Sequence, residues 1–443
     1  MNKHPKTHKI GHIFTRPVRR VFMFGLWMAF LIITPSVILY TAGYRYDFVK
    51  KQIKQTGVLS VDVEPRNSVV SLNGIQIERD IPIKLTNRAP GTYALKIERP
   101  GYKTWERDIA IESNNTTYIK GVTLIKDALP VRLFETDETV LSVKGYNDTL
   151  LVLKKVNELY ELHVINVTTD NDTLVYRTLN AVEPIVEVSP YASLAYSRIR
   201  GVNEDTLYLI SLTNPETTNI TPIKNDAVLT WNSINPTEPL YIYQDKNILI
   251  HSLTRSDRIA GIVSSSIWYR DKEGGIWEAY GNTIKNPHTQ TLYSLGDEID
   301  SIIHADNSKI IVTHKDKTIV AKLVNNGIES IQTINGIDTH YNRRTEEWLI
   351  WSPWELSSVY ADGGISLLNR SGDRIKNVSL LDQNGVLLLA TEKELSAFNP
   401  GYYVRHTLVS TDSYTLVSIN TTRRTLYFFG TFAGRIGIHS LEY

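Results

Sequence analysis

The sequence predicts an all-β protein held by one N-terminal transmembrane helix, and three observations support this prediction. One long segment is apolar and uncharged, the stretch after it alternates between apolar and polar residues, and the rest of the chain repeats with a period near forty residues. The chain has 443 residues, of which 42% are hydrophobic, so two or three folded domains are expected.

The apolar segment at residues 21–40, VFMFGLWMAFLIITPSVILY, is the predicted membrane span, and its helix is expected over 21–43. A helix of this length rises about 30 Å, the thickness of a bilayer hydrocarbon core. The preceding tail, residues 1–20, contains six bases and no acid, so the positive-inside rule predicts a cytoplasmic N-terminus and an extracytoplasmic bulk. A cleaved signal peptide is the alternative. Its cleavage sites are weak here, with Ala42 as one example, so an uncleaved anchor is favoured.

Charge and cysteine usage exclude several function classes. The chain has 48 bases and 47 acids; without the six bases of the tail, 42 bases remain, and the exported part carries a net charge of −5. A nucleic-acid partner is therefore not expected. Cysteine is absent, which excludes disulfides, thiolate metal sites and a cysteine nucleophile.

The segment after the span is expected to have two parts. Residues 44–55 are predicted to be a short basic juxtamembrane linker, with Tyr44 and Tyr46 at the depth of an interfacial aromatic belt. From residue 56 to 126, short runs alternate between apolar and polar residues and are separated by turn signals such as Asn73-Gly74. This pattern predicts a small antiparallel β-sandwich.

The same stretch, 56–126, resembles a PEGA domain. The resemblance rests on residues at strand ends and turns: Gly57, Pro65, Asn73-Gly74, Ile81-Pro82-Ile83, Pro90-Gly91 and Pro100-Gly101-Tyr102. The Pro-Glu-Gly-Ala sequence that names the family is here Pro65-Arg66-Asn67-Ser68. The resemblance implies a small extracytoplasmic β module beside a membrane anchor, one that binds or spaces surface components without catalysis.

Residues 130–443 contain eight repeats in which one apolar strand is followed, across a short polar turn, by a second. Equivalent positions lie 34 to 46 residues apart: Leu151, Leu194, Leu240, Ile276, Ile310, Leu349, Leu387 and Leu426. A period near forty with four strands per repeat predicts a β-propeller of seven or eight blades. Val188-Ser189-Pro190 resembles a sequence motif of TolB-like propellers, whereas the repeated Trp-Asp and Gly-His of WD40 propellers are missing. A strand at 130–135 is expected to complete the last blade, because an open sheet edge promotes aggregation.

The repeat suggests one candidate binding site. In seven of the eight repeats an acid lies 11 to 14 residues before the aligned strand, where the innermost strand of a blade should begin: Glu138, Glu183, Asp226, Asp297, Asp338, Asp373 and Asp412. These carboxylates are predicted to ring one mouth of the central channel and to attract a cation or a basic peptide. The alternative is that Asp simply suits the turns between blades.

A second candidate is the tryptophan cluster EEWLIWSPWE. Strand alternation predicts that Trp348 and Ile350 are buried, while Leu349 and Trp351 lie on the other, exposed face. Trp351 and Trp354 are therefore binding candidates, either as a platform for a sugar or peptide or, alternatively, as blade packing.

No catalytic or cofactor motif accompanies these candidates. The Gly-x-Ser-x-Gly elbow, His-Glu-x-x-His, the phosphate loop and the dinucleotide glycine fingerprint are all missing from the sequence. Asp170-Asn171-Asp172 lacks the remainder of a calcium loop and is interpreted as a solvated turn. We therefore expect no cofactor and no metal.

Together these observations predict a single-pass membrane protein of a bacterial-type cell envelope that binds or scaffolds an envelope protein or glycan and is not an enzyme. The alternative is a propeller-based hydrolase or lyase acting on surface polysaccharide. A signal-transducing receptor is disfavoured, because a tail of about twenty residues leaves no room for an output domain. The oligomeric state is open.

Overall fold

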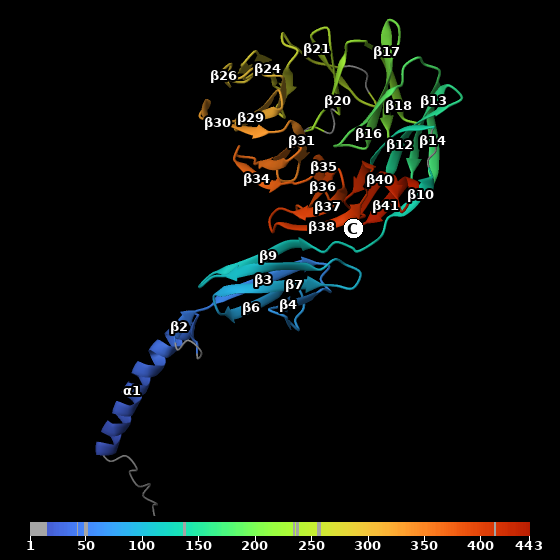
Figure 1. Cartoon of the computed structure of the whole chain (residues 1–443). Helices are drawn as coiled ribbons and strands as arrows, with labels where there is room; N and C mark the ends of the chain where they lie inside the picture. Colours follow the sequence, from blue (N-terminus) through green and yellow to red (C-terminus); the bar gives the residue numbers. More distant parts are fainter. Residues whose placement is uncertain are drawn as a thin grey trace, which may run out of the picture. The chain divides into compact units, whose positions relative to one another are not determined.

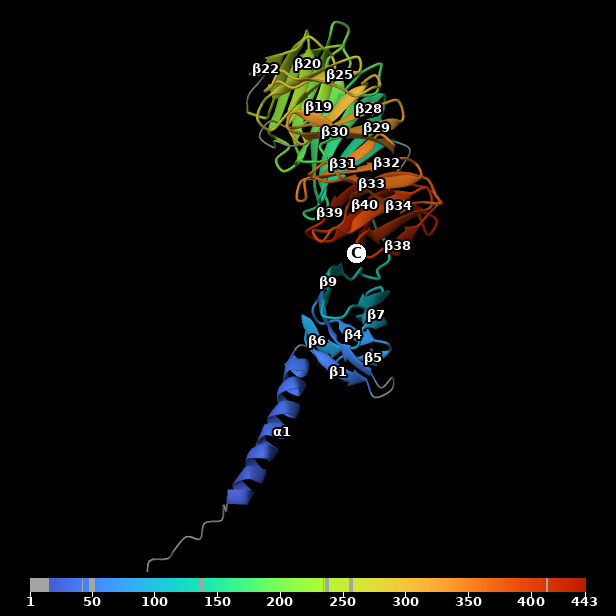
Figure 2. The ribbon, with the colours of Figure 1, turned by 90° about the vertical axis from the view of Figure 1, so that its left-hand side faces the viewer.

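The computed structural model describes residues 16–41, 43–47, 52–135, 139–233, 235, 239–254, 258–411 and 413–443. The chain divides into two compact units, one of residues 1–100 and 104–124, the other of residues 101–103 and 125–443. Each unit is described by itself below, and Figures 1 and 2 show their elements in two views at 90°.

The first unit begins with α1 (Arg16–Thr41), a helix of 26 residues. Its part Arg19–Thr41 is, among the described residues, the one helix long and apolar enough to cross a membrane. The helix continues through Pro35, and the hydroxyl of the next residue, Ser36, donates to the carbonyl of Ile32 at 2.7 Å.

The segment predicted to be a linker contains a hairpin instead. Strands β1 (Tyr44–Asp47) and β2 (Gln52–Gln55) pair antiparallel. The guanidinium of Arg45 lies 3.7 Å from the ring centre of Tyr40 and donates to the Tyr40 carbonyl at 2.8 Å. The backbone groups that a linker would leave to water are therefore paired within the hairpin.

Two sheets follow, with the strand orders β6-β3-β9 and β5-β4-β7-β8. Their strands are β3 (Gly57–Glu64), β4 (Val69–Leu72), β5 (Ile75–Gln76), β6 (Ile83–Arg88), β7 (Gly91–Glu98), β8 (Trp105–Ile111) and β9 (Thr116–Thr123). Alternate residues are buried, as on Leu59, Val61 and Val63 of β3. One pairing differs from the antiparallel prediction, because β3 and β9 run parallel. The Asn73-Gly74 turn has the positive φ values, 49° and 77°, that a two-residue hairpin requires.

The second unit contains eight successive four-stranded sheets among its described residues. We number them in chain order. Sheet 1 is β11 (Val140–Tyr146), β12 (Thr149–Val156), β13 (Leu159–Asn166) and β14 (Asn171–Thr178). Sheet 2 is β15 (Ile185–Val188), β16 (Leu194–Ile199), β17 (Glu204–Ser211) and β18 (Thr218–Lys224). Sheet 3 is β19 (Val228–Trp231), β20 (Leu240–Gln244), β21 (Asn247–His251) and β22 (Arg258–Ile262). Sheet 4 is β23 (Trp268–Arg270), β24 (Ile276–Tyr280), β25 (Thr283–Lys285) and β26 (Leu292–Ser294).

The remaining sheets have the same plan. Sheet 5 is β27 (Ser301–Ala305), β28 (Lys309–His314), β29 (Lys317–Val324) and β30 (Gly327–Asn335). Sheet 6 is β31 (Asp338–Asn342), β32 (Glu347–Trp351), β33 (Glu355–Val359) and β34 (Ile365–Arg370). Sheet 7 is β35 (Ile375–Leu380), β36 (Leu387–Thr391), β37 (Glu394–Asn399) and β38 (Val404–Ser410). Sheet 8 is β39 (Tyr414–Asn420), β40 (Thr425–Phe432), β41 (Arg435–Glu442) and, from the start of the unit, β10 (Val131–Glu135).

The sheets form a ring, which Figure 1 views along its axis. Several first strands of neighbouring sheets contact each other, namely β11 with β15, β23 with β27 and β31 with β35. In addition, β11 of sheet 1 contacts β39 of sheet 8. All eight positions aligned in the repeat fall in the second strand of a sheet. The predicted closing strand is confirmed, because β10 pairs antiparallel with β41, for example Val131 with Ser440. These features are typical of a β-propeller.

Packing between neighbouring sheets extends to the last residue. The side chain of Tyr443 is buried, and its hydroxyl donates to the carbonyl of Leu381, which follows the first strand of sheet 7, at 2.6 Å. Tyr443 also belongs to a hydrophobic cluster with Leu388 and Phe428, from sheets 7 and 8. Sheet 8 thus packs against sheet 7 through this cluster, and a second cluster packs it against sheet 1.

We predict that Tyr443→Ala lowers the free energy of unfolding by about 3–5 kcal/mol, because it removes a buried ring. Tyr443→Phe keeps the ring and should cost only about 1–2 kcal/mol, for the lost hydrogen bond. Urea unfolding of the full-length protein in detergent micelles measures both. Ile436→Ala, on an exposed position of β41, is the control, and an equal loss there would contradict the prediction.

Candidate functional site

The predicted ring of carboxylates lies where the repeat places it along the chain. Glu183, Asp226 and Asp373 each precede the first strand of a sheet by two residues, Asp297 precedes β27 by four, and Asp338 begins β31. Glu138 and Asp412 lie outside the described residues. Because the sheets repeat in one order around the ring, their first strands all begin at the same face.

The walls of the central cavity give the predicted ring no support. None of the five described carboxylates lines the central cavity. The carboxylate of Asp373 pairs with Lys393 of its own sheet at 3.1 Å. Burial raises the pKa of Asp338, which opposes the focused negative charge that a ring would need. The ring stays a prediction without support from the described residues.

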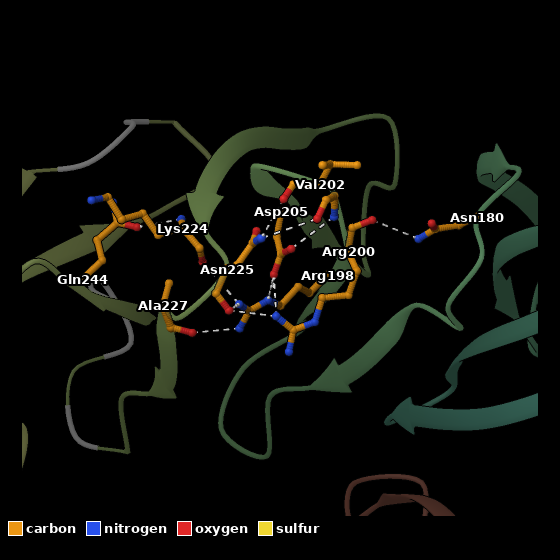
Figure 3. A network of polar contacts seen from close by, with 10 residues as sticks. Asn180, Arg198, Arg200, Val202, Asp205, Lys224, Asn225, Ala227 and Gln244 are labelled. Atoms are coloured by element: carbon orange, nitrogen blue, oxygen red, sulfur yellow. Dashed lines mark hydrogen bonds and ion pairs between the residues drawn. The ribbon is translucent and has the colours of Figure 1, made fainter.

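The turn that carries Asp226 is held by a buried charge cluster between sheets 2 and 3, shown in Figure 3. The side chain of Asp205 is 0% exposed, and its Oδ2 accepts from Arg198 Nε at 2.6 Å and from Arg200 Nη1 at 2.9 Å. Burial opposes the charge of Asp205, but Arg198 and Arg200 outweigh it and lower the pKa of this carboxyl. Arg198 also donates to the carbonyls of Ala227 and Asn225, both at 2.8 Å. The position of Asp226, between these two residues, is thus part of a structural joint.

We predict that Asp205→Asn destabilises the protein by about 3–5 kcal/mol, because two arginines lose their buried counter-charge. The matched control is Asp245→Asn. The ion pair of Asp245 with Lys224, at 2.6 Å, is half exposed, so its loss should cost less than about 1 kcal/mol. Thermal unfolding of the two variants gives the comparison, and equal costs would show that the joint adds no stability.

A central cavity of about 720 Å³ lies among the first strands of sheets 1, 2, 6, 7 and 8. Its charged lining residues are Lys144 and Glu187, which pair with each other at 3.1 Å. His340 also lines it, and burial lowers the pKa of this imidazole to about 4. The described walls of the cavity are therefore close to neutral at pH 7.

Of the two tryptophan candidates, Trp351 is buried and Trp354 is exposed. The expectation that Leu349 and Trp351 lie on an exposed face is wrong: they pack against sheet 7, while Trp348 and Ile350 pack against sheet 5. Alternation is preserved, but neighbouring sheets cover both faces. Trp351 contributes to the wall of the central cavity. Trp354 is 54% exposed in the turn between β32 and β33.

His340 predicts a pH dependence of stability. Its pKa in the folded state, about 4, lies below the ordinary 6.5, so the unfolded chain takes up the proton first and stability falls as the pH drops from about 6.5 to 4. We expect this part of the loss to be roughly 1–2 kcal/mol, because the side chain of His340 is only partly buried. Urea unfolding at pH 7.0 and 4.5 should show a smaller difference for His340→Gln than for the unmodified protein. Identical differences would remove His340 as the cause.

The first strands end at the opposite face, and there a polar side chain caps almost every turn. In each case a side-chain oxygen accepts from a backbone N–H two to four residues later, as Asp and Asn commonly do in turns. The capping residues are Ser189, Asn232, Asp271, Asp306, Asn342, Asp382 and Asn420. These residues recur four to eight residues before the aligned position of each repeat. Because the spacing varies, an alignment at fixed distance does not reveal them.

On this face, sheets 3 to 6 surround three small adjoining hollows of about 240, 180 and 200 Å³. They share Asp271 and Lys272 as lining residues. The remaining wall contains both acids and bases: Arg270, Glu273, His304, Asp306, Lys309, Arg343 and Glu346. We refer to these three hollows as the charged hollows.

Two aspartate–histidine pairs support the walls of the charged hollows. In sheet 4, Asp271 Oδ2 lies 2.8 Å from His288 Nε2 and accepts from Trp277 Nε1 at 2.9 Å. In sheet 5, Asp306 Oδ2 lies 2.8 Å from His304 Nε2, whose Nδ1 lies 2.9 Å from the hydroxyl of Tyr269. Burial opposes the charge of Asp306, but His304 and Ser308 outweigh it and lower the pKa of its carboxyl. Burial also raises the pKa of Tyr269.

The base of the charged hollows includes a buried lysine. The side chain of Lys309 is 4% exposed, and its Nζ donates to the carbonyl of Ala361 in sheet 6 at 2.8 Å. The same Nζ lies 3.7 Å from Asp306. Exposed Lys272 and Glu346 complete the rim. The wall of the charged hollows therefore contains positively charged donors and negatively charged acceptors.

Arg343, at the edge of the charged hollows, reaches across the ring. Its Nε donates to the carbonyl of Ser233 in sheet 3 at 2.7 Å, and its Nη1 donates to the carbonyl of Tyr191 in sheet 2 at 3.1 Å. Sheets 2 and 6 stand four places apart among eight. Burial raises the pKa of Tyr191 to about 12, partly offset by the guanidinium 5.1 Å from its ring centre. One side chain therefore joins opposite sides of this face.

Among the described residues, no three His, Asp or Glu side chains lie close enough together to hold a metal ion. At the turn first considered for calcium, the carboxylate of Asp172 lies 2.8 Å from His163 Nδ1. That carboxylate already has a partner, as expected of a structural turn.

Comparison with known proteins identifies one module. The PEGA domain family matches residues 56–124. These residues form a PEGA domain. The match covers the two sheets of the first unit and excludes α1 and the ring of sheets. Among proteins of curated function, none matches the chain.

Three solved structures are similar at low identity. An uncharacterized protein, lmo1340, from Listeria monocytogenes EGD-e has 12% identity and a TM-score of 0.39, covering 65% of this chain and 98% of its own. The β-propeller domain of Cps50 (Swd1) from Myceliophteria thermophila has 12% identity and a TM-score of 0.40, covering 71% and 100%. A functionally unknown protein from Desulfotomaculum acetoxidans DSM 771 has 10% identity and a TM-score of 0.34, covering 79% and 96%.

Proposed function

We propose that this chain is a membrane-anchored binding or scaffolding protein of a bacterial-type cell envelope, with a cytoplasmic N-terminus and the bulk of the chain outside. In this proposal α1 is an uncleaved anchor, the PEGA domain is a small β-sandwich, and residues 130–443 are an eight-bladed propeller. The basic tail before an apolar helix supports the orientation. The PEGA match and the ring of four-stranded sheets support an interaction function.

The charged hollows are the proposed binding face of the propeller, and a saccharide of the envelope is the proposed ligand. The observation that carries this choice is the density of fixed donors and acceptors around three adjoining hollows of sugar-sized volume. Hydroxyl groups both donate and accept, so a wall of interleaved acids and bases suits them. Acids and bases in the wall nearly balance, which favours a ligand of low net charge. An envelope protein is the less favoured ligand, because the lining of the hollows is mostly charged or polar.

Binding accounts for the hollows better than catalysis, the alternative. Asp271 Oδ1 accepts from the N–H groups of Glu273 and Gly275, and its Oδ2 contacts His288 and Trp277. A general acid or base needs an oxygen that is free to exchange a proton with the substrate. Asp306 is engaged in the same way on both oxygens. These carboxylates therefore suit positioning and recognition.

The proposal predicts a glycan-binding phenotype. The full-length protein in detergent micelles, screened against an array of bacterial surface glycans, should bind a subset above background. The double variant Lys272→Gln/Glu346→Gln keeps the net charge and should weaken binding to those glycans at least tenfold, because two exposed rim groups are lost.

The matched control is Lys155→Gln/Glu158→Gln, an exposed ion pair in a turn of sheet 1, which should change binding less than twofold. Absence of any glycan above background would overturn the proposal. Equal losses in the two double variants would also overturn it, because the effect would then not belong to the charged hollows.

A further inference from the structure

The PEGA domain carries a hollow of its own, independent of the propeller and of the saccharide proposal. It has a volume of about 250 Å³ and lies beside the β4–β5 turn, the segment that follows β5, and parts of β6 and β7. Its polar lining residues are Asn73, Gln76, Glu78, Arg79, Arg88 and Tyr93. Two arginines and one acid give its wall an excess of positive charge.

Neither arginine is paired with an acid in the described part of the chain. Arg79 Nη1 donates to the carbonyl of Lys84 at 2.9 Å. The Nε of Arg88 is buried and, among the described residues, has no hydrogen-bond partner. No described carboxylate pairs with either guanidinium, although the nearby Lys96 pairs with Glu98 at 2.8 Å. Since a guanidinium has five donors and an unsatisfied buried donor is costly, the two side chains are poised for an acceptor from outside.

The neutral groups of the wall also offer donors. The side-chain oxygen of Asn73 accepts from the N–H of Ala94 at 2.8 Å, so its amide nitrogen is the end left to donate. The hydroxyl of Tyr93 is occupied, donating to the carbonyl of Ala89 at 2.8 Å. Gln76 is exposed and adds a second amide. The hollow therefore combines two cationic forks with amide donors, which is the donor set that binds anionic oxygens.

We propose that this hollow binds an anionic group, a phosphate or a carboxylate, carried by a polymer outside the cell membrane. Arg88 and Arg79 are the primary ligands, and the amides of Asn73 and Gln76 complete the shell. Planar guanidinium groups match both phosphate and carboxylate through paired hydrogen bonds, which gives the site geometry as well as charge. The PEGA domain would thereby hold an anionic polymer, whatever the propeller binds.

Three probes distinguish the possible sources of the anion: inorganic polyphosphate, polygalacturonate and neutral dextran. Their binding to the full-length protein in a neutral detergent is measured by biolayer interferometry. At least one polyanion should bind more than tenfold more tightly than dextran, and added salt should weaken it. Preference for polyphosphate identifies a phosphate site, and preference for polygalacturonate identifies a carboxylate site.

Variants locate the site. Arg88→Gln and Arg79→Gln should each weaken polyanion binding at least tenfold, and Arg88→Lys should fall between, since it keeps the charge but not the fork. Arg66→Gln, an exposed arginine in the β3–β4 turn of the same domain, is the charge-matched control and should change binding less than twofold. Thermal unfolding checks that the variants are folded. If Arg88→Gln lowers stability, exposed Arg79 provides the same test.

Two outcomes would overturn the proposal. One is that neither polyanion binds more tightly than dextran. The other is that Arg66→Gln loses as much affinity as Arg88→Gln, since binding would then follow diffuse charge and not this hollow. Glycan binding by the charged hollows is measured separately, and the Lys272→Gln/Glu346→Gln variant should leave polyanion binding unchanged.

Discussion

The pairing of β10 with β41 is the constraint on which the ring of sheets depends. Without β10, sheet 8 would end in the free edge of β41, and the first and last parts of the unit would not be joined by backbone hydrogen bonds. Closure also lets every sheet bury both faces. Trp348 packs against sheet 5 and Trp351 against sheet 7, from opposite faces of one strand. This arrangement requires a neighbouring sheet on each side.

A closed ring gives the two ends of the first strands different chemistry. At the beginning of these strands the acids are mostly exposed, and one is paired within its sheet. At the other end, side-chain caps fix the turns, and Arg343 links sheet 6 to sheets 2 and 3. Fixed turns matter for recognition, because groups that are already held in place lose little entropy when a ligand binds. This difference is the physical reason for placing the binding face at the capped end.

Much of the fold could be predicted from the sequence, because it depends on periodicity. The aligned positions from Leu151 to Leu426 all fall in second strands, and the closing strand lies at Val131–Glu135 as expected. The errors arise where local pattern does not report tertiary context. Alternation could not show that neighbouring sheets cover both faces of Trp348–Trp351, and apolar runs do not reveal that β3 and β9 are parallel. The paired strands Tyr44–Asp47 and Gln52–Gln55 lack a strong apolar pattern, so the sequence predicted a linker there.

The candidate sites were harder to predict, because they depend on which turns meet in space. A window of fixed length before the aligned strand selected the acids at the start of the first strands. The informative residues lie at the other end, where loops of varying length obscure the register. The arginines of the PEGA hollow, Arg79 and Arg88, lie nine residues apart and line one hollow because the segment after β5 meets the end of β6, a strand of the other sheet. Neither set has a local motif.

The capped turns differ in whether the capping side chain is neutral or charged. Ser189, Asn232, Asn342 and Asn420 make the same cap without any charge, so the fold does not require an aspartate there. Sheets 4, 5 and 7 nevertheless use Asp271, Asp306 and Asp382. Of these, Asp271 and Asp306 are each paired with a histidine. Burying such charges offers little stability compared with neutral groups. The two aspartate–histidine pairs both adjoin the charged hollows, and this placement supports the proposed recognition function.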